Sequence, residues 1–151
     1  GGVPLSGVIG RRDLLDLPEI GNMSSTNSAN PISCSAGLAV IEEIQKKNLT
    51  NQSKIKGVIL HNELNKISKL KKNLFKVYGK GLIAALIFNK TIKNIDSRLK
   101  SLVEACIKDG LLMVYTGRES IKLGPPLTIS KDAIKVATKI IKKNILKIFN
   151  D

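Results

Sequence analysis

The sequence is poor in aromatic residues and cysteine, and it has a single histidine. Aromatic residues make up 3% of the chain, and tryptophan is absent. The two cysteines, Cys34 and Cys106, provide neither a disulfide framework nor the ligand spacing of a metal site. His61 has no Cys, Asp or Ser partner at a recognisable spacing, so we expect a surface or boundary position for it. These absences argue against a disulfide-stabilised scaffold and predict that no metal is bound.

Long apolar runs are also absent. No stretch approaches the roughly 20 apolar residues of a membrane-spanning helix, and no secretory signal opens the chain. Together with the low cysteine content, this predicts a cytoplasmic protein without a membrane partner. The chain starts at Gly1-Gly2 without a methionine, in what reads as a loop, and we therefore expect a partial chain.

What the chain does have is enough apolar content for one ordinary core and a strong positive charge. It has 151 residues, 42% of them hydrophobic, and a net charge of +13. Only four of the 25 basic residues are Arg, whereas recognition of phosphates and bases favours the planar fork of Arg. We interpret the charge as lysines on solvent faces of helices. A basic nucleic-acid-binding module remains the alternative.

A hydroxyl-rich turn leads into a helix at residues 24–31. Asn30 is a good N-cap and Pro31 suits the first helical position, and the apolar spacing of Cys34, Leu38, Ile41 and Ile44 predicts a helix from Pro31 to about Lys47. Hydroxyl and backbone N–H groups that converge before a helix favour phosphate binding. The same residues also suit a turn and a cap alone.

The run Thr26-Asn27-Ser28-Ala29-Asn30-Pro31, followed by Cys34 to Glu42, resembles class III aminotransferases. These are fold type I enzymes that use pyridoxal 5'-phosphate. The resemblance implies a homodimer with a composite active site, in which Thr26 binds the cofactor phosphate held by the neighbouring subunit. The backbone N–H of Ser25 is expected to add a second donor. Asn27 departs from the aromatic residue or His that is usual in the family.

The first eleven residues form a glycine-rich turn that leads to a short apolar segment, Val8-Ile9, which we predict to be a buried strand. The run Gly1-Gly2-Val3-Pro4-Leu5-Ser6 resembles the segment that follows the Schiff-base lysine in the same family. The first lysine of this chain is Lys46. We therefore expect the Schiff-base lysine to lie upstream of Gly1, and the fragment alone to be inactive.

The remaining pattern predicts an α/β protein in two parts. Residues 1–48 are expected to be the end of a large cofactor-binding domain. Residues 49–151 are expected to be a small C-terminal α+β domain with a mainly antiparallel sheet covered by helices. Expected helices cover 13–17, 52–73, 96–108 and a last segment capped by Ser130, and expected strands lie within 74–88, at 111–115 and at 120–123.

Two further segments resemble the same family, namely Gly79-Lys80-Gly81-Leu82 and Pro125-Pro126-Leu127. Lys122 stands where many members have an Arg, and in some of them that Arg orients a substrate carboxylate. Lys122 is therefore the candidate substrate-binding residue, with Arg118 nearby in sequence, although both also suit surface positions beside a strand. The resemblance implies transfer of an amino group from an amino acid or amine to an oxo acid or aldehyde, with an aminomutase as the alternative.

Overall fold

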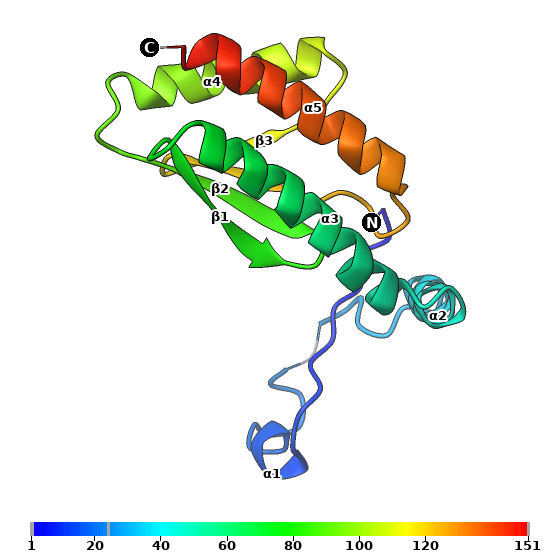
Figure 1. Cartoon of the computed structure of the whole chain (residues 1–151). Helices are drawn as coiled ribbons and strands as arrows, with labels where there is room; N and C mark the ends of the chain where they lie inside the picture. Colours follow the sequence, from blue (N-terminus) through cyan, green and yellow to red (C-terminus); the bar gives the residue numbers. More distant parts are fainter. Residues whose placement is uncertain (1, 24, 151) are drawn as a thin grey trace. The chain divides into compact units, whose positions relative to one another are not determined.

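The computed structural model describes residues 2–23 and 25–150. The chain divides into two compact units, Gly1–Asn48 and Leu49–Asp151. Within the described residues, the first unit contains helices only, whereas the second contains a sheet covered by helices (Figure 1).

The first unit contains helices α1 (Arg12–Leu15) and α2 (Pro31–Lys46). Helix α2 begins at Pro31 as predicted. The prediction of a buried strand at Val8-Ile9 is wrong, because neither residue pairs in a sheet and their exposed fractions are 80% and 102%. A strand needs a neighbour for its backbone hydrogen bonds, and residues 2–23 and 25–48 contain no other strand.

The N-terminal segment approaches α2 at Gly37. A Cβ atom at Gly37 would clash with the Leu5 side chain. The predicted apolar stripe of α2 is only partly covered: Cys34 and Ile44 are half-buried, whereas Leu38 and Ile41 are exposed.

The second unit is a four-stranded antiparallel sheet with helices on one face. In chain order its elements are α3 (Leu49–Leu70), β1 (Phe75–Lys80), β2 (Ile83–Phe88), α4 (Ile95–Lys108), β3 (Val114–Gly117), β4 (Ser120–Leu123) and α5 (Lys131–Ile148). The strands lie in the order β1-β2-β4-β3, and every neighbouring pair is antiparallel. Helices α3, α4 and α5 cover one face (Figure 1), which confirms the predicted α/β fold with an antiparallel sheet.

The core lies between the sheet and these helices. Inward residues recur at three- and four-residue spacing along each helix and at alternate positions along each strand. The largest side chains with almost no exposed surface are Leu64, Leu86, Leu99, Leu102, Cys106, Ile121, Ile134, Ile141 and Ile145. Lys56 joins this inward row of α3 at 8% exposure, and its Nζ donates to the Leu127 carbonyl at 3.2 Å. Lys56 is therefore an exception to the expectation that lysines lie on the solvent faces of helices.

The start of α5 and the end of α4 are both capped, and the Ser130 cap of α5 confirms its prediction. The Ser130 hydroxyl accepts a hydrogen bond from the Ala133 N–H at 3.0 Å and begins α5. After α4, the N–H groups of Gly110 and Leu111 donate to the carbonyls of Ile107 and Cys106. Gly110 has φ +88°, so this end is a Schellman motif that needs glycine.

The β3–β4 hairpin differs from its prediction. Strand β3 starts at Val114 rather than Leu111 and ends at Gly117 rather than Tyr115. The connection between the two strands is therefore two residues long, instead of the four residues, 116–119, that the sequence predicts. The two connecting residues, Arg118 and Glu119, both have positive φ, 52° and 51°, as a type I′ turn requires. Neither is a glycine or asparagine, so the sequence carries no signal for the turn type.

Candidate functional site

The loop before α2 is built on Asn30. Its side-chain Oδ1 accepts hydrogen bonds from the N–H groups of Ile32 at 3.0 Å and Ser33 at 3.3 Å, and its carbonyl accepts from Cys34 at 2.9 Å. Pro31 at the first helical position has no N–H to satisfy. The N-terminal N–H groups of α2 are therefore engaged internally. Ile32 and Ser33 therefore offer no free N–H group to a phosphate.

Ser25 and Ser28 close the turn that leads to Asn30. The Ser28 N–H donates to the Ser25 carbonyl at 3.0 Å, and the Ser25 N–H donates to Ser28 Oγ at 3.1 Å. The two hydroxyl oxygens are 2.9 Å apart. The Ser25 N–H is therefore already engaged, and it could reach a ligand only by exchanging this bond. Ser28 is not among the residues predicted from the sequence to bind the cofactor, although its spacing of three residues from Ser25 is typical of a hydroxyl-closed turn.

Thr26 lies exposed at the tip of this turn. Among the described residues, neither its hydroxyl nor its backbone N–H has a hydrogen-bond partner, and the same is true of the Asn27 N–H. A phosphate dianion is bound well by such neutral donors, because each can donate a charge-assisted hydrogen bond. The donors at Thr26 and Asn27 therefore fit a cofactor phosphate.

A hollow of about 750 Å³ adjoins the turn within the first unit. Among the described residues, its lining has no charged side chain and does not include Thr26. It consists of Pro4, Leu5, Ser6, Ser25, Asn27, Ser28, Ala29, Asn30, Ile32 and Ser33. The segment at residues 4–6 and the turn at residues 25–30 thus face one cavity, and both carry the family resemblance.

Lys122 and Arg118 belong to the second unit. Lys122 is exposed on β4, opposite Ala85 of β2 and Val114 of β3. It lines a mainly apolar hollow of about 430 Å³ together with the Leu123–Pro126 segment and Leu112. Arg118 is exposed in the hairpin turn at the other end of β4, so the structure does not bring the two cations together.

Shifted pKa values occur away from these candidate residues. A hydrogen bond from Lys100, and a second from the Tyr115 hydroxyl, lower the pKa of Asp96, and the same carboxylate raises the pKa of Tyr115. Lys143 and Asn144 lower the pKa of Asp109. Burial raises the pKa of the Cys106 thiol to about 11, so this thiol is unreactive at neutral pH. These hydrogen bonds connect α4 and the residue after it to β3 and α5. The groups do not form a catalytic cluster.

His61 is half-buried, which agrees with the boundary position that the sequence predicts. Its Nε2 is buried and has no hydrogen-bond partner among the described residues. In that part of the chain no three His, Cys, Asp or Glu side chains gather as metal ligands. None of the helices within residues 2–23 and 25–150 has both the length and the apolar character needed to cross a membrane.

The sequence profile of the family described as Aminotransferase class-III matches residues 1–145. The chain belongs to the class III aminotransferases. This class III chain is 38% identical over 118 residues to the acetylornithine aminotransferase of Prochlorococcus marinus. The matched residues make up 78% of the chain and 27% of that relative. The chain is 32% identical to the mitochondrial ornithine aminotransferase of Rattus norvegicus, over 95% of the chain and 31% of that relative.

Solved class III structures share its fold. The acetylornithine aminotransferase from Elizabethkingia anophelis superposes with a TM-score of 0.80 at 31% identity, over 92% of the chain and 34% of that structure. The ornithine aminotransferase from Plasmodium yoelii has a TM-score of 0.82 at 24% identity, which supports the fold alone. A leucine/methionine racemase from Thermococcus litoralis is also 32% identical, over 89% of the chain and 31% of that relative. The chain thus spans about a third of the length of its relatives.

Proposed function

We propose that the protein containing this chain is a pyridoxal-phosphate-dependent aminotransferase. It moves an amino group from an amino acid or amine to an oxo acid or aldehyde, so each turnover consumes one donor and one acceptor. The observation that carries the proposal is the family match over residues 1–145. The names of the relatives make ornithine and acetylornithine the first donors to test.

The turn at residues 25–28 is proposed to hold the cofactor phosphate. When bound, the cofactor supplies the electron sink for chemistry at the amino carbon. The Thr26 hydroxyl donates to a phosphate oxygen, with the Thr26 and Asn27 N–H groups beside it. Ser25 contributes once its bond to Ser28 is exchanged. Exposure of Thr26 is compatible with a composite site in a homodimer, in which the cofactor is held mainly by the other subunit.

The lysine that carries the cofactor is proposed to come from outside residues 1–151. The first lysine here, Lys46, lies near the end of α2 and not in the segment that resembles the family's lysine motif. We therefore expect the 151-residue chain alone to be inactive. A reduced cytoplasmic setting is proposed on the basis of the free thiols of Cys34 and Cys106.

Lys122 is the proposed partner of a substrate carboxylate. In the full-length enzyme, Lys122→Ala is expected to raise the KM for the carboxylate-bearing substrate while kcat changes little, because the lost contact holds bound substrate and transition state alike. Lys142→Ala on the exposed side of α5 removes the same charge and is the control. An unchanged KM in the Lys122 variant would leave it as a surface charge.

The reaction type is tested by supplying substrates separately to the full-length, cofactor-loaded protein. An aminotransferase converts ornithine or acetylornithine to the oxo product continuously only when an oxo acid is present. A racemase, the reaction named for one relative, interconverts the enantiomers of leucine with no acceptor. An aminomutase moves the amino group within one molecule, also with no acceptor. Acceptor-independent turnover would therefore overturn the proposed transfer reaction.

A further inference from the structure

The stretch from Leu64 to Ile95 is unusual in charge. It contains eight lysines and no Asp or Glu. Several lysines elsewhere pair with acidic side chains, namely Lys47 with Glu43, Lys100 with Asp96, and Lys143 with Asp109. Within the stretch, Lys66 pairs with Glu63, which precedes it. The fold gathers several lysines of the acid-free stretch around one hollow, where the end of α3 meets β1 and the end of β2.

This basic hollow has a volume of about 870 Å³. Lys69 and Lys72 reach it from the last turn of α3 and the residues after it, Lys76 from β1, and Lys90 from the residues after β2. All four are exposed, and among the described residues none of them forms an ion pair. The described lining includes no carboxylate. Such a concentration of one sign of charge raises the local concentration of anions.

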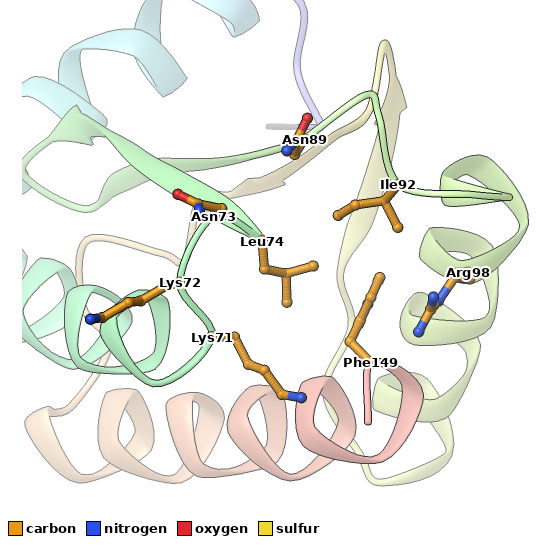
Figure 2. A pocket seen from close by; sticks show the side chains of 8 residues that line it. All are labelled: Lys71, Lys72, Asn73, Leu74, Asn89, Ile92, Arg98 and Phe149. Atoms are coloured by element: carbon orange, nitrogen blue, oxygen red, sulfur yellow. The ribbon is translucent and has the colours of Figure 1, made fainter. Parts of the chain in front are cut away.

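A smaller hollow of about 300 Å³ adjoins the first and shares Lys72, Asn73 and Asn89 with it. Figure 2 shows Lys71 and Lys72 extending in different directions from the turn after α3, so that positive charge spreads over both hollows. Arg98 lines the smaller hollow, but it is engaged: it donates to the Ile148 carbonyl at 2.6 Å and lies over the Phe149 ring.

The basic hollow also has groups that suit an aromatic base. Tyr78 of β1 is 55% exposed at its wall, next to the partly exposed Ile87. Asn89 Oδ1 accepts from the N–H and hydroxyl of Thr91, which leaves the amide Nδ2 as a donor. Aromatic faces stack with bases of any sequence, and a hollow of this volume is within the usual range for a ligand of nucleotide size.

We propose that the basic hollow binds a small molecule with several phosphate groups, of the nucleoside polyphosphate class. The ammonium groups of Lys69, Lys72, Lys76 and Lys90 bind the phosphates, and Tyr78 stacks on the base. This site lies in the second unit and is independent of the proposed cofactor site. Its test therefore succeeds or fails separately from the proposed transamination.

The test is calorimetric titration of the full-length, cofactor-loaded protein with ATP, inorganic tripolyphosphate, adenosine and a single-stranded DNA oligonucleotide. We expect ATP to bind more tightly than tripolyphosphate, and adenosine not to bind. Lys76→Gln with Lys90→Gln should weaken both phosphate ligands roughly tenfold. Tyr78→Ala should remove the advantage of ATP over tripolyphosphate and leave tripolyphosphate binding unchanged.

The matched control is Lys139→Gln with Lys142→Gln, which removes two exposed charges from α5. It should leave ATP binding unchanged. An equal loss in the control variant would show diffuse surface attraction and overturn the site. Absence of ATP binding, or tighter binding of the oligonucleotide than of ATP at physiological salt, would overturn it as well, the latter in favour of an extended nucleic-acid surface.

Discussion

At the scale of single residues, Thr26 is the position where a local change should affect the cofactor most directly. Its donors are unengaged within the described part of the chain and stand at the tip of a hydroxyl-closed turn. One hydrogen bond to a charged group is worth about 1.5–3 kcal/mol. Thr26→Ala in the full-length enzyme is therefore expected to weaken cofactor affinity roughly ten- to hundredfold, measured by equilibrium dialysis.

The control for this change is Thr26→Ser, which keeps the hydroxyl and should restore most of the affinity. Dimer content is measured in parallel by sedimentation, because loss of the dimer would also weaken a composite site. Unchanged cofactor affinity in the alanine variant would reduce Thr26 to a turn residue ahead of α2.

Asp109 gives a residue-scale prediction about pH. Its carboxylate accepts from Lys143 Nζ at 2.9 Å and from Asn144 Nδ2 at 2.8 Å, and these contacts lower its pKa. A lowered folded-state pKa gives stability that is present above the unfolded-state value of about 3.9 and is lost as the pH falls through the folded-state value. Asp109→Asn should therefore lower stability at pH 7 and make the variant less sensitive to acid, as measured by urea unfolding at several pH values.

The matched carboxylate is Asp132, which is 91% exposed and lies 3.7 Å from Lys135 within α5. Asp132→Asn should change the acid profile less than Asp109→Asn does. An identical profile for the Asp109 variant and the unchanged protein would show that the contacts with Lys143 and Asn144 contribute nothing to stability.

At the scale of elements, helix α3 approaches the β1–β2 turn at a point where only glycine fits. A Cβ atom at Gly57 would clash with the backbone of Gly81, and that turn is further held by the Leu82 N–H, which donates to Ser53 Oγ at 3.3 Å. Gly57→Ala should therefore destabilise the protein by about 1–3 kcal/mol, as overpacking does. Thermal unfolding measures the change. Gly124→Ala, where a Cβ atom meets open space, should be close to neutral.

Element starts were predictable where a local rule decides them. Asn30-Pro31 and Ser130 mark the starts of α2 and α5, and Gly110 marks the end of α4, because caps depend on a few adjacent residues. The prediction of a strand at Val8-Ile9 was wrong because a strand depends on a partner strand, which the local sequence pattern does not specify. The expectation that lysines lie on solvent faces was wrong for Lys56 because it considered charge alone. The spacing of Lys56 from Leu60 and Leu64 places it on the inward row of α3.

The candidate site was predictable only in part. Family resemblance and turn chemistry both selected Thr26, whose role as a phosphate ligand remains a prediction. The folded turn shows that Ser28 Oγ engages the Ser25 N–H and that Asn30 Oδ1 engages the Ile32 N–H. The spacing of Ser25 and Ser28 was the sequence signal for the first of these bonds. Lys122 was selected because many class III members have an Arg at this position. Nothing in its local sequence pattern distinguishes it from the other lysines.

At the scale of the whole molecule, charge is divided unequally between the two units. Residues 1–48 have four basic and five acidic side chains, whereas residues 49–151 have 21 and seven. The excess positive charge therefore belongs to the second unit, where most of the buried apolar side chains also lie.

Limited proteolysis of the 151-residue chain should reveal this difference in packing. Residues 2–23 and 25–48 include many exposed apolar side chains, such as Val8, Leu17, Ile20 and Met23, whereas the second unit has a continuous core. We expect a nonspecific protease to cut first before about residue 50 and to leave a resistant fragment that mass spectrometry identifies as the second unit. Equal protection at both ends would contradict this division.

The strand order β1-β2-β4-β3 also predicts an order in which the strands pair during folding. Each outer strand joins its inner neighbour through a short hairpin, so both hairpins close small loops at little entropic cost. The inner pair β2–β4 instead joins segments separated by α4 and β3. We therefore expect the two hairpins and α4 to form early, and the nonlocal pairing of β2 with β4 to limit the folding rate of the sheet.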